Sequence, residues 1–267
     1  MDLAIIGLGN MGQAILDGIL ENKIIAAENI TAADKKFSYN NFEEKNKYPK
    51  LNFTADNVEA VKKSDLVIIA VKPQIINLVL EEIKNVVSNK NIISIAAGIT
   101  IEHLKKILGR KSRITRIMPN TPALVSQGMS AVSFAENISK KEKDIVIEIF
   151  SALGEIVEVE EKDMDAVTAL SGSGPAFVYI FIEALSDAGV LKGLDRSTAL
   201  KLAAQTVKGG AEMILKTDKH PAELKDMVTS PAGTTINGVA SLESNSFRSA
   251  VIKAVSKAAE RSEELGK

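Results

Sequence analysis

The chain has 267 residues, enough to bury a sizeable core and typical of one or two domains. Its 33 basic and 34 acidic residues leave a net charge of −1, which disfavours nucleic acid or an anionic membrane as a partner. Cysteine is absent, which excludes disulfides, zinc–thiolate sites and thiol catalysis, and two histidines are too few to hold a metal alone. We therefore expect a cytoplasmic protein without a metal centre.

The start of the chain lacks a basic segment followed by a long apolar run. No later apolar run has the length that a bilayer-spanning helix requires. Export and membrane insertion are both disfavoured by this pattern.

Short apolar runs rich in β-branched residues alternate with helical patterns through roughly the first 150 residues. We expect strands at 3–6, 30–33, 66–71, 92–96 and 114–118, and helices at 11–20, 55–63, 75–87 and 101–108. A further strand, a helix and an edge strand are expected at 130–135, 140–153 and 155–158. This alternation predicts a Rossmann-type, doubly wound α/β domain with a parallel sheet.

From residue 164 onward the periodicity is helical, with no convincing strand. We place the boundary after Glu161, giving a dinucleotide-binding domain at 1–161 and an all-helical domain at 162–267. Several helices of the second half have wide apolar faces, as at 176–182, and a small helical layer cannot bury them all. We therefore expect a homo-oligomer built through this half. The expected helices are 175–190, 196–216, 221–227, 236–242 and 247–265.

A glycine pattern, Gly7-x-Gly9-x-x-Gly12, follows the first expected strand and opens the first expected helix. Glycines in this context let the backbone turn tightly and approach a pyrophosphate, which then lies at the helix N-terminus. A tight turn without a ligand is the alternative. The surrounding strand–helix alternation favours dinucleotide binding.

The end of the second strand, Asp34-Lys35-Lys36, predicts contact with the cofactor ribose but not which cofactor. An acid there binds the 2′-hydroxyl of NAD(H), whereas a lysine accepts the 2′-phosphate of NADP(H). Two other strand ends, Val71-Lys72-Pro73 and Ala97-Gly98, should edge the same crevice because ligands bind at the carboxyl ends of parallel strands. Asn57 is either a ligand of the cofactor or a helix cap.

The loop Val228–Thr235 lies between two expected helices and combines hydroxyl side chains with a glycine at a helix start. Unpaired backbone N–H groups at such a start suit a small carboxylate. The alternative is that Thr234 and Thr235 only cap the following helix. This loop is the expected substrate site.

Together these motifs resemble pyrroline-5-carboxylate reductase over essentially the whole chain. The resemblance implies NAD(P)H-dependent reduction of L-1-pyrroline-5-carboxylate to L-proline, an N-terminal nucleotide domain and a helical dimerisation domain, with dimers often assembled into decamers. Ala232 stands where many members have glycine. The resemblance rests on Gly7-Leu8-Gly9-Asn10-Met11-Gly12, Val71-Lys72-Pro73, Met118-Pro119-Asn120-Thr121-Pro122-Ala123, Leu170-Ser171-Gly172-Ser173-Gly174-Pro175-Ala176, His220-Pro221-Ala222-Glu223-Leu224-Lys225-Asp226 and Ser230-Pro231-Ala232-Gly233-Thr234-Thr235-Ile236.

Carried over residue by residue, the resemblance implies two sets of contacts. Residues Gly7 to Gly12, Asn57, Val71, Lys72, Pro73, Ala97 and Gly98 would contact NADPH or NADH, and we add Asp34 and Lys35. Glu161, Ser230, Gly233, Thr234 and Thr235 would line the substrate site. We expect the N–H groups of Gly233 and Thr234 to hold the carboxylate, and the Thr235 hydroxyl to bond the ring nitrogen as the one catalytic side chain.

Three rival functions stay open from the residues themselves. One is a dehydrogenase of another small cyclic imine. Another is a dehydrogenase of small 3-hydroxy acids, in which a lysine base follows the Gly-x-Gly turn of the first long helix; Val178 occupies that position here. The third is a protein that senses a dinucleotide without catalysis, under which the intact substrate-like loop has no evident purpose.

Overall fold

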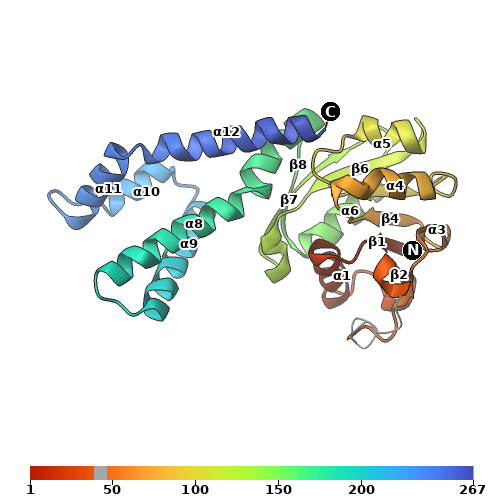
Figure 1. Ribbon diagram of the computed structural model, residues 1–267, viewed down its shortest axis with the longest axis horizontal. Helices are drawn as coiled ribbons and strands as arrows, with labels where there is room; N and C mark the ends of the chain where they lie inside the picture. Colours follow the sequence, from red (N-terminus) through yellow and green to blue (C-terminus); the bar gives the residue numbers. More distant parts are fainter. Residues whose placement is uncertain (39–46, 267) are drawn as a thin grey trace. The chain divides into compact units, whose positions relative to one another are not determined.

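The computed structural model describes residues 1–38 and 47–266. Two compact units make up the chain: the first contains residues 1–173 and 257–267, and the second contains residues 174–256 (Figure 1). The change of unit after Ser173 lies beyond the domain boundary expected after Glu161, and the end of the last helix belongs to the first unit. The division into functional domains at Glu161 stays a prediction.

An eight-stranded sheet forms the centre of the first unit, in the order β3-β2-β1-β4-β5-β6-β7-β8. Strands β1 to β6 are mutually parallel, β7 is antiparallel to β6, and β8 is parallel to β7. This order, with β1 between β2 and β4, is the doubly wound arrangement that the alternating pattern predicted. The strands are β1 (Leu3–Ile6), β2 (Ile30–Ala33), β3 (Asn52–Thr54), β4 (Leu66–Ile69), β5 (Asn91–Ser94), β6 (Arg113–Met118), β7 (Gly128–Phe134) and β8 (Gly154–Glu158).

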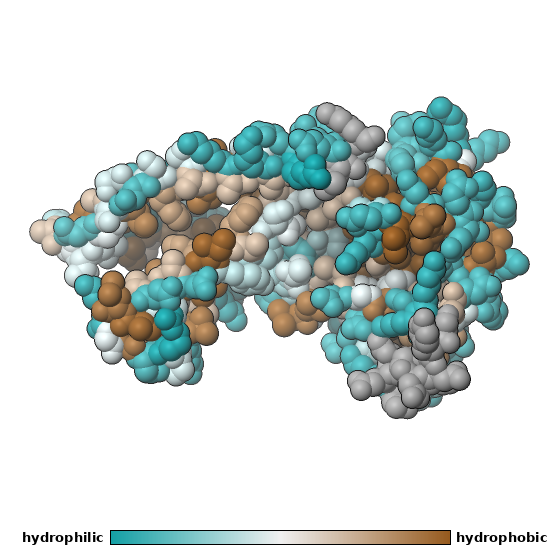
Figure 2. Space-filling view, viewed as in Figure 1, coloured by the Kyte–Doolittle hydropathy of each residue, from teal (hydrophilic) through white to brown (hydrophobic). Residues whose placement is uncertain are grey.

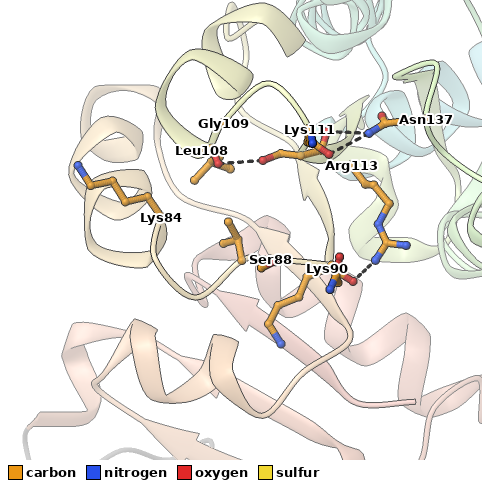
Figure 3. A pocket seen from close by; sticks show the side chains of 11 residues that line it. Lys84, Ser88, Lys90, Leu108, Gly109, Lys111, Arg113 and Asn137 are labelled. Atoms are coloured by element: carbon orange, nitrogen blue, oxygen red, sulfur yellow. Dashed lines mark hydrogen bonds between the residues drawn. The ribbon is translucent and has the colours of Figure 1, made fainter.

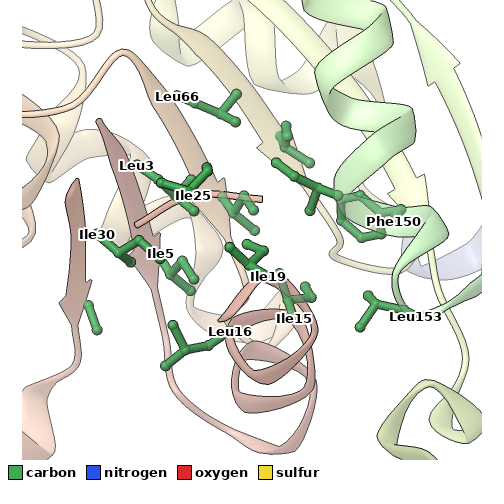
Figure 4. Packing of buried hydrophobic residues seen from close by; sticks show 14 of the residues in the cluster. Leu3, Ile5, Ile15, Leu16, Ile19, Ile25, Ile30, Leu66, Phe150 and Leu153 are labelled. Atoms are coloured by element: carbon green, nitrogen blue, oxygen red, sulfur yellow. The ribbon is translucent and has the colours of Figure 1, made fainter. Parts of the chain in front are cut away.

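Helices cover both faces of this sheet, and β1 shows why. Its alternate residues point to opposite faces: Leu3 and Ile5 join a core with α1 (Asn10–Glu21) and α6 (Lys140–Ser151), which Figure 4 shows around Ile19 and Phe150. Ala4 and Ile6 join a second core with α3 (Asn57–Lys62), α4 (Pro73–Ile83) and α5 (Ile101–Leu108). The central strands β1, β2, β4 and β5 are therefore buried on both sides, which explains their continuous runs of residues without exposed side chains.

One strand of the sheet was missed in the sequence. β3 has three residues, all partly or fully exposed, and pairs only with β2 at the edge of the sheet. A strand this short and exposed leaves no apolar run to detect. The predicted strand at 66–71 also ends early, at Ile69, because Pro73 and the turn before it begin α4.

The second unit is helical, as expected, but has almost no core of its own. Over residues 174–256, all of which are described, the buried residues are Ser186, Ala199 and Ala203. Apolar side chains stand instead on its surface (Figure 2), including Ile180 at 65% and Leu215 at 73% exposure. The helices are α8 (Gly174–Leu191), α9 (Arg196–Thr217), α10 (Pro221–Met227), α11 (Thr234–Ser244) and α12 (Phe247–Leu265), the last of which continues into the first unit.

We expected no apolar segment long enough to span a membrane, and this expectation was wrong about the length of one segment. A π-helical turn at Thr168–Gly172 joins the short α7 (Met164–Val167) to the region of α8. The helical stretch Glu161–Leu191 is consequently long and apolar enough to cross a membrane by length and composition. The sequence pattern hid this because the Ser–Gly segment before Pro175 looked like a break.

Candidate dinucleotide site and substrate loop

The glycine turn between β1 and α1 has the geometry of a phosphate cradle. Gly7 has φ of +94°, a conformation that favours glycine, and its N–H donates to the Ala33 carbonyl at 2.8 Å. A Cβ on Gly12 would lie 2.0 Å from the Gly7 carbonyl oxygen, so no side chain fits there. A Cβ on Gly9 would meet nothing within 4 Å, and Gly9 caps α1 without a side-chain hydrogen bond. The helix start is open, as pyrophosphate binding requires.

Asp34, directly after β2, faces this turn. Its Oδ2 accepts the Leu8 N–H at 2.8 Å and its Oδ1 accepts the Lys36 N–H at 3.0 Å. The Lys36 ammonium in turn donates to the Leu8 carbonyl at 3.1 Å. The carboxylate therefore fixes the glycine turn to the end of β2, where a ribose lies in proteins of this fold.

A cavity of about 250 Å³ opens at the carboxyl ends of β1, β2 and β4. Asn57 is 7% exposed, and its amide donates to Glu82 Oε2 at 2.7 Å. The alternative that Asn57 is only a cap is wrong, because Asp56 caps α3 by accepting two backbone N–H groups. Five predicted cofactor residues line the cavity, namely Gly7, Asp34, Lys35, Asn57 and Val71. The other lining residues are apolar: Ile6, Ala33, Ile75, Leu78 and Val79.

The remaining predicted cofactor residues lie at the same edge of the sheet but do not line that cavity. Lys72 is the N-cap of α4, with Pro73 as its first residue. Ala97 and Gly98 follow β5, and Gly98 has φ of +76°. The structure thus brings the predicted cofactor residues to the carboxyl ends of four neighbouring parallel strands, β2, β1, β4 and β5.

Glu161 begins the short 3-10 turn after β8, in the first unit, and its side chain contacts the first residue of α5. Its Oε1 accepts the Ile101 N–H at 2.6 Å and is 3.4 Å from Nη1 of Arg116. Arg116 is 4% exposed in the middle of β6, and sequence reasoning missed it. A lone charged residue in an otherwise apolar strand was the available signal, because such residues are seldom buried without a partner.

Two motifs of the family resemblance meet in the first unit. The Asn120 amide donates to the Ser171 carbonyl at 3.2 Å and accepts the Met129 N–H at 2.8 Å. Gly172 packs so closely against Met118 that a Cβ would lie 2.5 Å from Cε of the methionine. These contacts explain the small residues before α8 as close packing.

The expected substrate site, Val228–Thr235, consists of a loop at 228–233 between α10 and α11 and the first two residues of α11, all in the second unit. Ala232 takes the left-handed conformation with φ of +58°, which a glycine would adopt without strain. The Gly233 N–H donates to the Ser230 carbonyl at 3.1 Å. Its expected role in binding the substrate carboxylate stays a prediction. A Cβ on Gly233 would lie 2.3 Å from Ser230 Oγ.

The start of α11 carries unsatisfied donors. Gly233 is its N-cap, and no side chain accepts a hydrogen bond from the first turn. Thr234 and Thr235 are the first residues of the helix, so the alternative that they cap it was wrong. Neither hydroxyl has a hydrogen-bond partner within residues 1–38 and 47–266. The first-turn N–H groups of an α-helix have no partner inside the helix, and they attract anions.

A different cavity, of about 480 Å³, lies at the amino-terminal ends of β5 and β6 (Figure 3). Three of its four cationic side chains, those of Lys84, Lys90 and Arg113, have partners. Arg113 pairs with Glu142 at 3.0 Å and Lys84 pairs with Glu81 at 2.6 Å. The Asn137 amide donates to the Lys111 carbonyl at 3.0 Å. These contacts fix the turns, and they lie at the opposite strand ends from the glycine cradle.

Metal binding has no support in the part of the chain that the structure describes. No group of three or more histidine, aspartate or glutamate side chains there is arranged to hold an ion.

Comparison with known proteins agrees with this arrangement. Residues 161–265 match the family described as pyrroline-5-carboxylate reductase dimerisation, and residues 2–98 match the family described as NADP oxidoreductase coenzyme F420-dependent. The pyrroline-5-carboxylate reductase of Methanosarcina acetivorans is 48% identical over 99% of this chain and 98% of its own, and that of Escherichia coli is 40% identical over 99% and 98%.

A solved structure gives the same result for the fold. The Plasmodium falciparum pyrroline carboxylate reductase with NADP bound has a TM-score of 0.91 and 41% identity, covering 100% of this chain and 98% of the other. The glycine cradle, the uncapped α11 and these full-length similarities lead to one conclusion: the chain belongs to the pyrroline-5-carboxylate reductase family.

Proposed function

We propose that this protein reduces L-1-pyrroline-5-carboxylate to L-proline with a hydride from NADH or NADPH, the last step of proline biosynthesis. Family membership over the full chain supports the proposal. The observation that carries the chemistry is the start of α11, where uncapped N–H groups adjoin two unpartnered threonine hydroxyls. A small carboxylate with a ring nitrogen beside it suits this set of donors.

The cofactor fits the first unit because the cradle offers open space where a phosphate must approach. A Cβ on Gly9 would meet no protein atom within 4 Å, whereas the chain itself fills the positions beside Gly7 and Gly12. The residues from Gly7 to Gly12 would hold the pyrophosphate at the start of α1. Asp34, Lys35, Asn57 and Val71 would line the adenosine portion, and Lys72, Pro73, Ala97 and Gly98 would edge the crevice. When bound, the dinucleotide supplies the hydride.

The substrate carboxylate would be held by N–H groups of Thr234 and Thr235 in the first turn of α11. The Thr235 hydroxyl would donate to or accept from the ring nitrogen and so fix which ring carbon faces the cofactor. A hydroxyl is a poor acid at neutral pH, so Thr235 orients the imine while the proton arrives with the substrate or through water. The family resemblance also assigns Glu161, Ser230 and Gly233 to substrate binding, and these assignments stay proposals.

Little covalent chemistry is required of the side chains. A protonated cyclic imine already accepts a hydride at carbon. Holding the two reactants in the right orientation can therefore lower the barrier by several kcal/mol, about the size of the effect known for well-oriented reactions. A site made of backbone donors and hydroxyls is sufficient for this task.

Assembly of this protein into an oligomer is part of the same proposal. Residues 161–265 match a dimerisation family, and the second unit buries only three residues. An unburied apolar surface of this kind is unstable in water without a partner. We infer a dimer formed through the second unit in the cytoplasm, with a decamer of five such dimers as the higher assembly.

Replacing Thr235 tests the proposed site. With pyrroline-5-carboxylate and a saturating dinucleotide, Thr235→Val should lower kcat at least tenfold while leaving the dissociation constant of the dinucleotide unchanged, because the lost hydroxyl acts on the imine and not on the cofactor. Thr235→Ser, which keeps the hydroxyl, should retain most of the activity. Wild-type turnover in Thr235→Val would remove this hydroxyl from the mechanism.

A further inference from the structure

Glu82 lies beside the ribose end of the cofactor cavity, although no motif marks it. It belongs to the last turn of α4, and its Oε2 accepts a 2.7 Å hydrogen bond from the Asn57 amide. Its Oε1 is 4.0 Å from the Lys35 ammonium. Asn57 and Lys35 both line the cavity. The carboxylate of Glu82 therefore lies beside two of the three polar side chains that line the cavity, Asp34 being the third.

Among the described residues, two lysines and two carboxylates meet at this place. Lys36 donates to the Leu8 carbonyl at 3.1 Å, and the Lys35 ammonium is 4.0 Å from Glu82 Oε1. The carboxylate of Asp34 adds a second negative charge directly after β2. A 2′-phosphate needs uncompensated positive charge at this strand end, whereas a 2′-hydroxyl needs only a hydrogen-bond acceptor. The local charge balance thus opposes the phosphate.

The two partners of Glu82 differ in how firmly they are held. The Asn57 amide is buried, so its 2.7 Å hydrogen bond fixes the carboxylate in place. The Lys35 side chain is 80% exposed, and an ion pair of that kind is weak. Glu82 is thus the fixed charge of the group and Lys35 the movable one.

We propose that Glu82 is a specificity-determining residue that discriminates against the 2′-phosphate of NADPH and makes NADH the preferred hydride donor. The inference rests on the proposed function, because it assumes that the cavity holds the adenosine portion of the dinucleotide. Glu82 acts by repelling the phosphate directly and by offsetting the charge of Lys35, which would otherwise attract the phosphate.

The test compares two neighbouring glutamates of α4. Glu82→Gln removes the charge but keeps an oxygen that accepts from Asn57. Glu81→Gln is the matched control, because Glu81 pairs with Lys84 and contacts neither Asn57 nor Lys35. Dissociation constants for NAD⁺ and NADP⁺ are measured by calorimetry on the full-length protein, and kcat/KM for NADH and NADPH is measured with pyrroline-5-carboxylate.

Glu82→Gln should raise the ratio of NADP⁺ affinity to NAD⁺ affinity about tenfold. A carboxylate about 8 Å from a doubly charged phosphate would have an effect of this size at an effective dielectric constant of about 60. The ratio of kcat/KM values should move with it, and Glu81→Gln should leave both ratios within about twofold of wild type.

Lys35 gives an independent check on the mechanism. Lys35→Ala should change the NADP⁺ to NAD⁺ ratio little in the wild type, where Glu82 offsets the charge of the ammonium. In the Glu82→Gln protein the same substitution should remove a large part of the gained NADP⁺ affinity, because Lys35 is then free to reach the phosphate. If Glu82→Gln does not fold, Glu82→Ala carries the same prediction.

The failure of the Glu82 proposal can be distinguished from the failure of the proposed function. A Glu82→Gln ratio equal to that of wild type or of Glu81→Gln would overturn the role of Glu82, even if the enzyme turns over normally. A wild-type preference for NADPH would contradict the proposed direction. By contrast, a wild-type protein that binds dinucleotide but reduces no pyrroline-5-carboxylate would refute the proposed function and leave the affinity ratios as the remaining test of Glu82.

Discussion

The glycines at positions 9 and 12 should respond to alanine in opposite ways. Gly9 has φ of −75° and ψ of −174°, which any residue adopts, and an added Cβ would meet nothing within 4 Å. A Cβ on Gly12 would lie 2.0 Å from the Gly7 carbonyl oxygen and 3.4 Å from the Cβ of Ala70. Gly9→Ala should therefore spare the fold and block the cofactor, whereas Gly12→Ala should strain the fold itself.

The two stability changes can be set out from this geometry. Gly9→Ala loses only the N-cap preference of glycine over alanine, which is about 0.5–1 kcal/mol. At about 2–4 °C per kcal/mol for a chain of this size, Tm should fall by a few degrees. For Gly12→Ala the helix and the Gly7 carbonyl must separate by about 1 Å to relieve the clash. Overpacking of that degree costs about 2–4 kcal/mol.

Thermal unfolding with and without dinucleotide, together with calorimetric affinities, measures both effects. In the wild type a dinucleotide at 100 times its dissociation constant should stabilise the folded state by about 2.7 kcal/mol. Gly9→Ala should keep a near-normal Tm without ligand and lose most of this stabilisation, because its Cβ occupies the place of the pyrophosphate. Normal dinucleotide affinity in Gly9→Ala, or unchanged stability in Gly12→Ala, would refute this description of the cradle.

Three further predictions follow from the structure. Burial and, secondarily, a hydrogen bond to Asp17 raise the pKa of Tyr48 to about 12. The folded state therefore holds the phenol proton more tightly than the unfolded state, so this contribution to stability is present below about pH 10 and is lost between about pH 10 and 12. Tyr48→Phe should consequently flatten the fall of the denaturation midpoint in that window. Arg116→Met should lower the free energy of unfolding by about 2 kcal/mol, because the partly buried carboxylate of Glu161 loses its cation; equal denaturation midpoints would contradict this. Ile180→Glu, at an exposed apolar site of α8, should shift the protein from dimer to monomer in light scattering, and an unchanged mass would place the dimer interface elsewhere.

The fold of the first unit was predictable because its signals are local. Alternating apolar strands and amphipathic helices, with Gly7, Gly9 and Gly12 at the first turn, define the doubly wound sheet without knowledge of distant contacts. β3 was not predictable, because three exposed edge residues carry no periodic pattern. The observed strand order is one that doubly wound sheets adopt.

The sites were predictable where function depends on backbone conformation and less so where it depends on side chains meeting across the sheet. The positive φ of Gly7 and the open start of α11 follow from short motifs. The contacts of Glu82 with Asn57 and of Arg116 with Glu161 join residues 25 and 45 positions apart, and no spacing rule reveals them. The hydrogen bond of the Gly233 N–H with the Ser230 carbonyl has the same origin, because it depends on how the loop closes.

The most direct test of the proposed function follows dinucleotide absorbance when the purified protein meets pyrroline-5-carboxylate, with NADH and NADPH in parallel and proline measured as the product. We predict oxidation of the dinucleotide with one proline formed for each molecule oxidised, and faster turnover with NADH. A folded protein that binds dinucleotide and yields no proline with either cofactor would contradict the assignment as a reductase of this imine.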